Sequence, residues 1–155
     1  MKQARELVHG TCVALGRRGV LLRGGAGSGK SDLALRFMAL PSGGALCPGL
    51  VADDQVYVTA NPDGTLTASA PPTIAGKIEV RGLGIMPVPF LPEAELVLVC
   101  DLAGSNDVPR MPPESEKTTV LAGVPLPTLR LAPFEASAPL KLKMALLRAT
   151  PDNAN

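Results

Sequence analysis

Residues 24–31 read Gly24-Gly25-Ala26-Gly27-Ser28-Gly29-Lys30-Ser31, and this stretch decides the fold of the chain. It fits the phosphate-binding P-loop pattern G-x-x-x-x-G-K-[ST]. An apolar run at 20–22 leads into it and a helix-like run at 32–39 follows, which is the strand–loop–helix context that the motif requires. In a chain with 16 glycines a Gly-rich turn could match by accident, but these flanking runs argue against that interpretation. We therefore predict a nucleotide-binding α/β domain.

The P-loop residues suit the phosphates of a nucleotide for physical reasons. Glycines allow successive backbone N–H groups to point at one phosphate, and the N-terminus of the helix behind them favours negative charge. The ammonium group of Lys30 can reach the β- and γ-phosphates, and the Ser31 hydroxyl can bind Mg²⁺. These residues predict phosphate binding but leave open where the phosphate goes.

Composition narrows the function classes. The 155 residues are enough for one domain, and 46% hydrophobic with 19% charged residues is typical of a globular fold. A net charge of +1 and only 3% aromatic residues argue against nucleic-acid binding, and no apolar run approaches the length of a membrane span. The three cysteines form no CxxC pair, and the N-terminus lacks the apolar core of a signal peptide. We therefore expect a cytoplasmic protein with no nucleic-acid or membrane partner.

The 16 prolines and the many short apolar runs predict a strand-rich fold with few helices. A strand is expected at 6–15, and after a turn at 16–19 a second strand at 20–23 should pair with it as a hairpin. The polar, Pro-rich segment 104–117 is expected to be a mobile surface loop. Further strands are expected at 50–52, 55–59, 65–70, 95–101, 118–121 and 127–131, with a terminal helix at 140–148 and a frayed tail at 151–155.

Two places carry acids after apolar strands, where a kinase would need a metal ligand or a base. Asp53 and Asp54 follow the run at 50–52, and Asp101 follows the run at 96–100. Adjacent strand residues point to opposite faces, so one acid of the pair could face a metal and the other a substrate hydroxyl. The alternatives are two solvated acids at a turn and, for Asp101, an acid that caps the end of a strand.

Three further residues have open interpretations. His9, the only histidine, is either a packed or surface residue or the partner of a catalytic acid. Glu79 and Arg81 are two positions apart and would share one face of a strand. They could bind a metal and balance phosphoryl charge, or they could form an ordinary ion pair between strands.

Four blocks of the sequence stand out, and they are His9-Gly10, the P-loop, Ala52-Asp53-Asp54, and Ile78-Glu79-Val80-Arg81-Gly82-Leu83-Gly84-Ile85. In order and spacing, these four blocks resemble the catalytic domain of the HPr kinase/phosphorylase family. The last of these looks like the family signature and is more specific than the P-loop. The similarity runs from about residue 7 to 148 and is weaker after Asp101. It implies a P-loop fold similar to that of phosphoenolpyruvate carboxykinase, and ATP-dependent phosphorylation of a serine in HPr, the phosphocarrier protein of the sugar phosphotransferase system.

The resemblance also implies which residues bind the nucleotide and its metal ion. The backbone of residues 24–31 and the Lys30 side chain would bind the ATP phosphates. Ser31 and Glu79 match the positions that hold Mg²⁺, and Asp54 would support the metal or its water.

The catalytic residues implied by the resemblance come from the other blocks. Asp53 matches the residue that takes the proton from the substrate serine, and His9 matches a catalytic histidine that interacts with that acid. Arg81 lies in the signature block, and Arg110 looks like the arginine of a mobile loop in the family. Asp101 is then expected to be structural.

The sequence departs from longer family members in two places. Those members carry an additional N-terminal domain, whereas here the matching positions begin almost at residue 1. We expect a single catalytic domain over 1–155, with a core at about 7–148 and a tail at 149–155, similar to a short form found in α-proteobacteria. Longer members also carry basic residues linked to phosphorolysis near 131–137. Here residues 132–137 hold no Lys or Arg, which predicts weak or absent phosphorylase activity.

Two other functions remain open from the residues. One is a P-loop kinase of small molecules, although the Arg-rich lid helices typical of nucleotide kinases are not evident. The other is a regulatory module in which ATP only switches a surface that binds a partner. The longer family members are hexamers, so the resemblance implies a homo-oligomer, with HPr as its protein partner and the 104–117 segment as a candidate docking loop.

Overall fold

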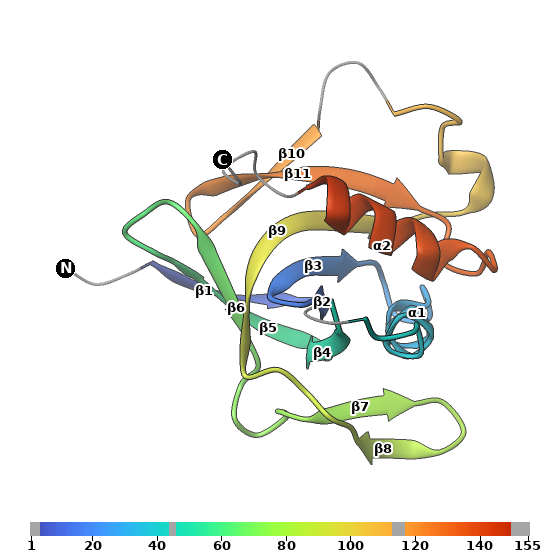
Figure 1. Cartoon of the computed structure of the whole chain (residues 1–155), viewed down its shortest axis with the longest axis horizontal. Helices are drawn as coiled ribbons and strands as arrows, with labels where there is room; N and C mark the ends of the chain where they lie inside the picture. The colour runs from blue at the N-terminus through green and yellow to red at the C-terminus, as the bar shows by residue number, and fades with distance from the viewer. Residues whose placement is uncertain (1–3, 44–45, 113–116, 150–155) are drawn as a thin grey trace.

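The computed structural model of the chain describes residues 4–43, 46–112 and 117–149. A mixed sheet forms its centre, in the spatial order β1-β5-β6-β9-β3-β2-β4, and β11 with its partner β10 joins the second half of β9. Figure 1 shows the long, bent β9 crossing the molecule, with both α-helices beside the sheet. The expected tail beyond residue 149 and part of the 104–117 segment lie outside the described residues.

The elements follow one another along the chain in a simple order. The sheet strands are β1 (Arg5–His9), β2 (Thr11–Leu15), β3 (Arg18–Arg23), β4 (Pro48–Ala52), β5 (Gln55–Ala60), β6 (Leu66–Ser69), β9 (Glu93–Leu102), β10 (Lys117–Leu121) and β11 (Val124–Leu131). A separate two-stranded hairpin consists of β7 (Lys77–Val80) and β8 (Gly84–Pro87). The helical segments are α1 (Lys30–Met38), α2 (Ala138–Arg148) and the short 3-10 turn η1 (Ser105–Asp107). Neither α-helix in this described part of the chain has a segment that could span a lipid bilayer.

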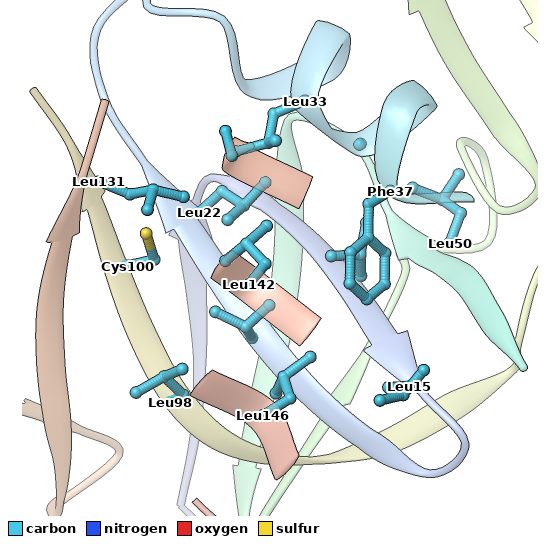
Figure 2. Packing of buried hydrophobic residues seen from close by; sticks show 14 of the residues in the cluster. Leu15, Leu22, Leu33, Phe37, Leu50, Leu98, Cys100, Leu131, Leu142 and Leu146 are labelled. Atoms are coloured by element: carbon cyan, nitrogen blue, oxygen red, sulfur yellow. The ribbon is translucent and has the colours of Figure 1, made fainter. Parts of the chain in front are cut away.

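The central strands are buried on both faces, which explains their continuous apolar sequence. On one face Leu22 of β3 packs in a cluster with Phe37 of α1 and Leu142 of α2 (Figure 2). On the other face the adjacent residue Leu21 belongs to a second cluster, which includes Val56 of β5. Because successive strand residues point to opposite faces, β3 contributes to both clusters and joins them. The strand that leads into the P-loop is therefore held firmly.

The expected strand at 6–15 is wrong in one respect, because it breaks at Gly10. The part before the break, β1, pairs with β5, whereas β2 pairs with β3 and β4. The chain passes so close to β3 here that a Cβ on Gly10 would lie 2.7 Å from the Leu22 carbonyl oxygen. The Gly10 N–H instead donates a 2.9 Å hydrogen bond to the carbonyl of Asp54. The break therefore directs His9, the last residue of β1, toward the acids that follow β4.

The expected hairpins β2–β3 and β5–β6 are confirmed, and β10 and β11 also pair as antiparallel neighbours. In the segment 78–85 the strand β7 ends at Val80, and a turn at 81–83 leads into β8. Arg81 is therefore in the turn, and the expectation that it shares a strand face with Glu79 is wrong. The Leu83 N–H closes this turn on the Val80 carbonyl at 2.9 Å.

Three neighbouring strands of the sheet run parallel, and this positions the site. The strand β9 is parallel to β3 on one side and to β11 on the other. The carboxyl ends of parallel strands lie at the same edge of a sheet, which is where α/β proteins bind ligands. The P-loop after β3, residues 103–104 after β9 and residues 132–134 after β11 therefore meet at one edge.

Candidate active site

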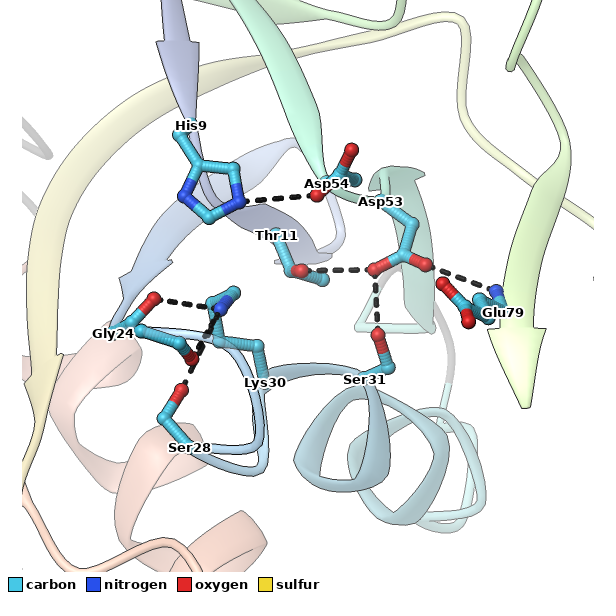
Figure 3. A network of polar contacts seen from close by, with 10 residues as sticks. His9, Thr11, Gly24, Ser28, Lys30, Ser31, Asp53, Asp54 and Glu79 are labelled. Carbon is cyan, nitrogen blue, oxygen red and sulfur yellow. Dashed lines mark hydrogen bonds and ion pairs between the residues drawn. The ribbon is translucent and has the colours of Figure 1, made fainter. Parts of the chain in front are cut away.

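The P-loop connects β3 to α1, which confirms its expected strand–loop–helix context (Figure 3). Its backbone passes through the left-handed region at Gly27, with φ 78°, and at Gly29, with φ 97°, where glycine is not strained. Gly29 precedes α1 without a side-chain cap, so the first N–H groups of this helix have no side-chain acceptor from that position. A loop of this shape at a helix N-terminus suits an anionic group.

The side chain of Lys30 lies inside the loop and is only 9% exposed. Its Nζ donates hydrogen bonds to the carbonyl oxygens of Gly24, at 2.6 Å, and Gly25, at 3.0 Å. The Ser28 Oγ is 3.5 Å from the same nitrogen. A positive charge is thus held at the centre of the loop, where it would attract a phosphate.

Asp53 is buried and links the P-loop to two other segments of the chain, β2 and β7. Its Oδ1 accepts hydrogen bonds from the Ser31 hydroxyl, at 2.8 Å, and from the Thr11 hydroxyl, at 2.9 Å. Its Oδ2 accepts the backbone N–H of Glu79 at 3.0 Å. Both carboxylate oxygens therefore have partners, and the acid holds the first turn of α1 against β2 and β7.

Asp54 points away from this network and toward His9. The His9 Nε2 lies 3.0 Å from Asp54 Oδ1, and both side chains are well exposed, at 60% and 71%. The expectation that His9 interacts with Asp53 is wrong, because the two adjacent acids face opposite ways. Asp54 also has a φ of 70°, a left-handed conformation that is uncommon for residues with a side chain but that Asp adopts more readily than most. The hydrogen bond from Gly10 to the Asp54 carbonyl holds it in this conformation.

The remaining expected site residues, Glu79, Arg81 and Arg110, are exposed. Figure 3 shows the Glu79 side chain next to Asp53, which agrees with the hydrogen bond between them. Arg81 lies in the exposed β7–β8 turn, and Arg110 lies in the exposed segment after η1. Within the described residues, no hydrogen bond or ion pair joins either arginine to the Asp53 network.

Asp101, at the end of β9, forms an ion pair with Arg23, the residue before the P-loop. Arg23 Nε is 2.7 Å from Asp101 Oδ1, and a second nitrogen is 3.0 Å from Oδ2 and 3.2 Å from the Thr119 hydroxyl. A two-pronged pair of this kind has fixed geometry. The ion pair therefore ties the carboxyl end of β3 to β9, and Arg23 also ties it to β10 through Thr119, in agreement with the structural interpretation of Asp101.

The residues around Ser31 could hold a magnesium ion only together with other ligands. Over the ranges that the structure describes, no three His, Cys, Asp or Glu side chains are grouped so that they could hold a metal ion by themselves. Mg²⁺ prefers oxygen ligands and usually combines one or two carboxylates with phosphates and water. The Ser31 hydroxyl and the Asp53 carboxylate, with Glu79 beside them, fit that donor set.

Sequence reasoning missed two contributors to the site. Thr11 is a buried hydroxyl on Asp53, and a polar residue in the otherwise apolar run 11–15 was the available signal. Arg36 of α1 donates to the carbonyls of Pro133 and Glu135, and so holds the segment after β11 against the helix. No local pattern predicts the latter contact, because its partners are almost a hundred residues apart.

A family model described as HPr Serine kinase C-terminal domain matches residues 2–130. The HPr kinase/phosphorylase of Lacticaseibacillus casei is 37% identical over 84 residues, which is 54% of this chain and 24% of that protein. The HPr kinase/phosphorylase of an Azoarcus species is 33% identical over 135 residues, covering 80% of this chain and 41% of that protein. The chain therefore spans less than half the length of the curated relatives it matches.

A solved structure agrees with the family match. The Hpr(Ser) kinase/phosphatase from Coxiella burnetii superimposes with a TM-score of 0.73 at 25% sequence identity. The similarity covers 92% of this chain and 94% of that chain. The expected strand-rich P-loop kinase fold is thus confirmed over nearly the whole described structure.

Proposed function

The chain belongs to the HPr serine kinase C-terminal domain family, and from this membership we propose that it transfers the γ-phosphoryl group of ATP to a serine hydroxyl of HPr. One observation carries the proposal: the P-loop serine, Ser31, is hydrogen-bonded to Asp53, and Asp54 next to it pairs with His9. The P-loop, a candidate metal-binding acid and a candidate base therefore lie close together, which supports the proposal. These are the parts that phosphoryl transfer to a hydroxyl requires.

The nucleotide phosphates are bound by the P-loop backbone and by Lys30. In the structure the Lys30 ammonium is already hydrogen-bonded to loop carbonyls, so its charge is oriented before a ligand arrives. A donor that enters the loop takes over these hydrogen bonds with its β- and γ-oxygens. The free N–H groups at the start of α1 add to the attraction.

We assign the metal-binding role to Ser31, Asp53 and Glu79. When bound there, Mg²⁺ would neutralise charge on the phosphate oxygens during transfer. Asp53 positions the Ser31 hydroxyl through its 2.8 Å hydrogen bond, and its buried position leaves no room for a protein substrate. From the sequence we expect Asp53 to be the base and Asp54 to support the metal, so this proposal exchanges their roles.

The geometry supports Asp54 as the acid that takes the serine proton. One of its oxygens contacts His9 Nε2, and the exposed side chain leaves the other accessible to a hydroxyl on a large partner. As the serine oxygen bonds to the γ-phosphorus, the bond between that phosphorus and the β–γ bridging oxygen breaks. The serine proton passes to Asp54, and His9 fixes the orientation of this carboxylate. Arg81 and Arg110 remain candidates for contacts with the phosphoryl group or with HPr.

Mass spectrometry of HPr after incubation with this protein, ATP and Mg²⁺ tests the proposal directly. We expect one added phosphoryl group on a serine, and none when Lys30→Ala replaces the wild type. Unmodified HPr, together with phosphorylation of a compound in a metabolite panel, would indicate a small-molecule kinase instead. ATP binding without turnover on any acceptor would indicate a regulatory module.

The reverse reaction is proposed to be weak. In phosphorolysis, inorganic phosphate attacks phosphoserine and pyrophosphate leaves, so a second anion must be bound. The segment 132–137 holds no Lys or Arg, and Arg36 next to it already donates to two of its carbonyls and pairs with Asp32. Incubation of serine-phosphorylated HPr with the protein and phosphate should therefore release little pyrophosphate. Rapid release would contradict this part of the proposal.

A homo-oligomer is also proposed on the basis of the family. The helix α2 carries exposed apolar residues at Leu140, Met144 and Leu147, whose spacing places them on one side of the helix. An apolar stripe of this kind is suited to contact with another protein surface. Light scattering coupled to size-exclusion chromatography would measure the assembly. A mass equal to one chain across the accessible concentration range would contradict it.

A further inference from the structure

A cavity of about 210 Å³ lies beside the P-loop and is lined by Ser28, Leu102, Ala103, Gly104, Pro133 and Phe134. We propose that it receives the purine base of the nucleotide whose phosphates the P-loop binds, and that it accepts adenine and guanine alike. The inference rests on the proposed nucleotide binding and extends it to the recognition of the base. Of the six lining residues, Ser28 is the one that the sequence assigns to the site.

The fold explains why this cavity adjoins the phosphate loop. Its walls come from the segments that follow three parallel neighbours, β3, β9 and β11. Ser28 belongs to both the P-loop and the cavity, so a nucleoside attached to phosphates in the loop can enter the cavity directly. Figure 1 shows the turns after β9 and β11 at the same end of the sheet as the β3–α1 connection.

The volume of the cavity and the aromatic ring in its lining suit one ring system of a ligand. Pockets that enclose a whole drug-sized ligand measure roughly 300–1,000 Å³, so this one suits part of a ligand. Phe134 is 70% exposed although its ring lies against the loop, where a Cβ on Gly29 would be 3.0 Å from its ring carbons. The hydrogen bond from Arg36 to the Pro133 carbonyl holds this segment in place. An exposed aromatic ring fixed beside a phosphate site is a stacking surface for a base.

The lining offers little that could distinguish one purine from another. The Ala103 N–H donates to the Leu131 carbonyl at 3.0 Å, and the Gly104 carbonyl accepts the Asp107 N–H at 2.9 Å. The Ser28 hydroxyl lies 3.5 Å from Lys30 Nζ. Strong discrimination requires hydrogen-bonding groups aimed at the ligand. Because these polar groups have partners within the protein, the base would be recognised by its shape and its flat face.

Binding measurements test this site without relying on turnover. Isothermal titration calorimetry of the full chain with Mg²⁺ would compare ATP, GTP and inorganic tripolyphosphate, in the absence of HPr. We expect ATP and GTP to bind within about fivefold of each other, and each at least about fivefold more tightly than tripolyphosphate. Phe134→Ala should weaken binding of both nucleotides by about fivefold or more and change tripolyphosphate affinity less than about twofold. Phe134→Trp, which keeps an aromatic ring at this position, should bind both nucleotides about as tightly as the wild type.

Two further variants complete the test. Ala103→Leu should fill the cavity and weaken nucleotide binding while sparing tripolyphosphate, whereas Met144→Ala, an exposed apolar residue on α2, should change neither. The proposal is overturned if Phe134→Ala and Ala103→Leu, folded by circular dichroism, leave nucleotide affinity unchanged or weaken tripolyphosphate equally. A GTP affinity more than about tenfold below that of ATP would overturn the shared recognition of purines. If ATP bound normally but HPr was not phosphorylated, the proposed function would be contradicted and the base-binding site would still be supported.

Discussion

The Ser31 hydroxyl donates a 2.8 Å hydrogen bond to Asp53 Oδ1, across 22 positions of the sequence. This contact joins the residue after the P-loop lysine to an acid that is buried at the end of β4. Asp54, the next residue, is exposed and pairs with His9 instead. The two acids therefore differ in burial and partners, and substitutions should separate their roles.

Asp53→Asn should destabilise the fold. An amide in place of the carboxylate turns one acceptor into a donor, so at least one of Ser31, Thr11 and the Glu79 N–H loses its acceptor. A buried donor without a partner costs roughly 1–3 kcal/mol. Urea denaturation followed by far-ultraviolet circular dichroism would measure the loss. Unchanged stability would show that the network around Asp53 does not support the fold.

Asp54→Asn should spare stability and remove activity. The side chain is 71% exposed, so we expect the free energy of unfolding to change by less than about 0.5 kcal/mol. Loss of a general base typically lowers the rate by roughly 10²–10⁴-fold. The rate of HPr phosphorylation and the affinity for ATP would be measured together, and ATP affinity should stay within about twofold. If Asp54→Asn phosphorylated HPr at the wild-type rate while Asp53→Asn was folded but inactive, Asp53 would be the general base instead.

The P-loop and most strands could be predicted because each depends on a short local pattern. The glycines, the apolar run before them and the helix after them are contiguous, and the structure confirms all three. The break at Gly10 could not be predicted in the same way. It depends on how closely Gly10 approaches Leu22, and the sequence of residues 6–15 alone does not predict this contact.

The sequence pattern could not predict which acid pairs with His9, for a related reason. Asp53 and Asp54 do face different ways, but both lie in the bend between β4 and β5 and not in a strand, so strand alternation is not the reason and does not say which acid turns toward β1. That choice is made by the positive φ of Asp54 and by the Gly10 N–H on its carbonyl. Both features arise where two strands that are distant in sequence come together.

Thr11→Val should weaken the Asp53 network while leaving the Asp54–His9 pair in place. The substitution keeps the branched shape but removes the hydroxyl that donates to Asp53 Oδ1 at 2.9 Å. A hydrogen bond to a charged group contributes about 1.5–3 kcal/mol, and we expect a loss of that order in urea denaturation. Thr11→Ser, which keeps the donor, is the matched control. Equal stability of the two variants would mean that this hydroxyl contributes nothing.

Alkaline pH should destabilise the protein through two buried thiols. Burial raises the pKa of Cys12 from 9.0 to about 12, and burial together with the charge of Asp101 raises the pKa of Cys100. In the unfolded chain these thiols ionise near pH 9, so above that pH the folded state binds more protons than the unfolded state. Their stabilising contribution is therefore complete below pH 9 and is lost as pH rises toward 12.

The slope of stability against pH measures this effect. Between pH 9 and the raised pKa, each buried thiol should lower the free energy of unfolding by about 1.4 kcal/mol per pH unit. Cys12→Ala should reduce the slope by that amount, even if the smaller side chain also lowers stability at every pH. If Cys12→Ala gave the same slope as the wild type, ionisation of the buried Cys12 thiol would not be what limits alkaline stability.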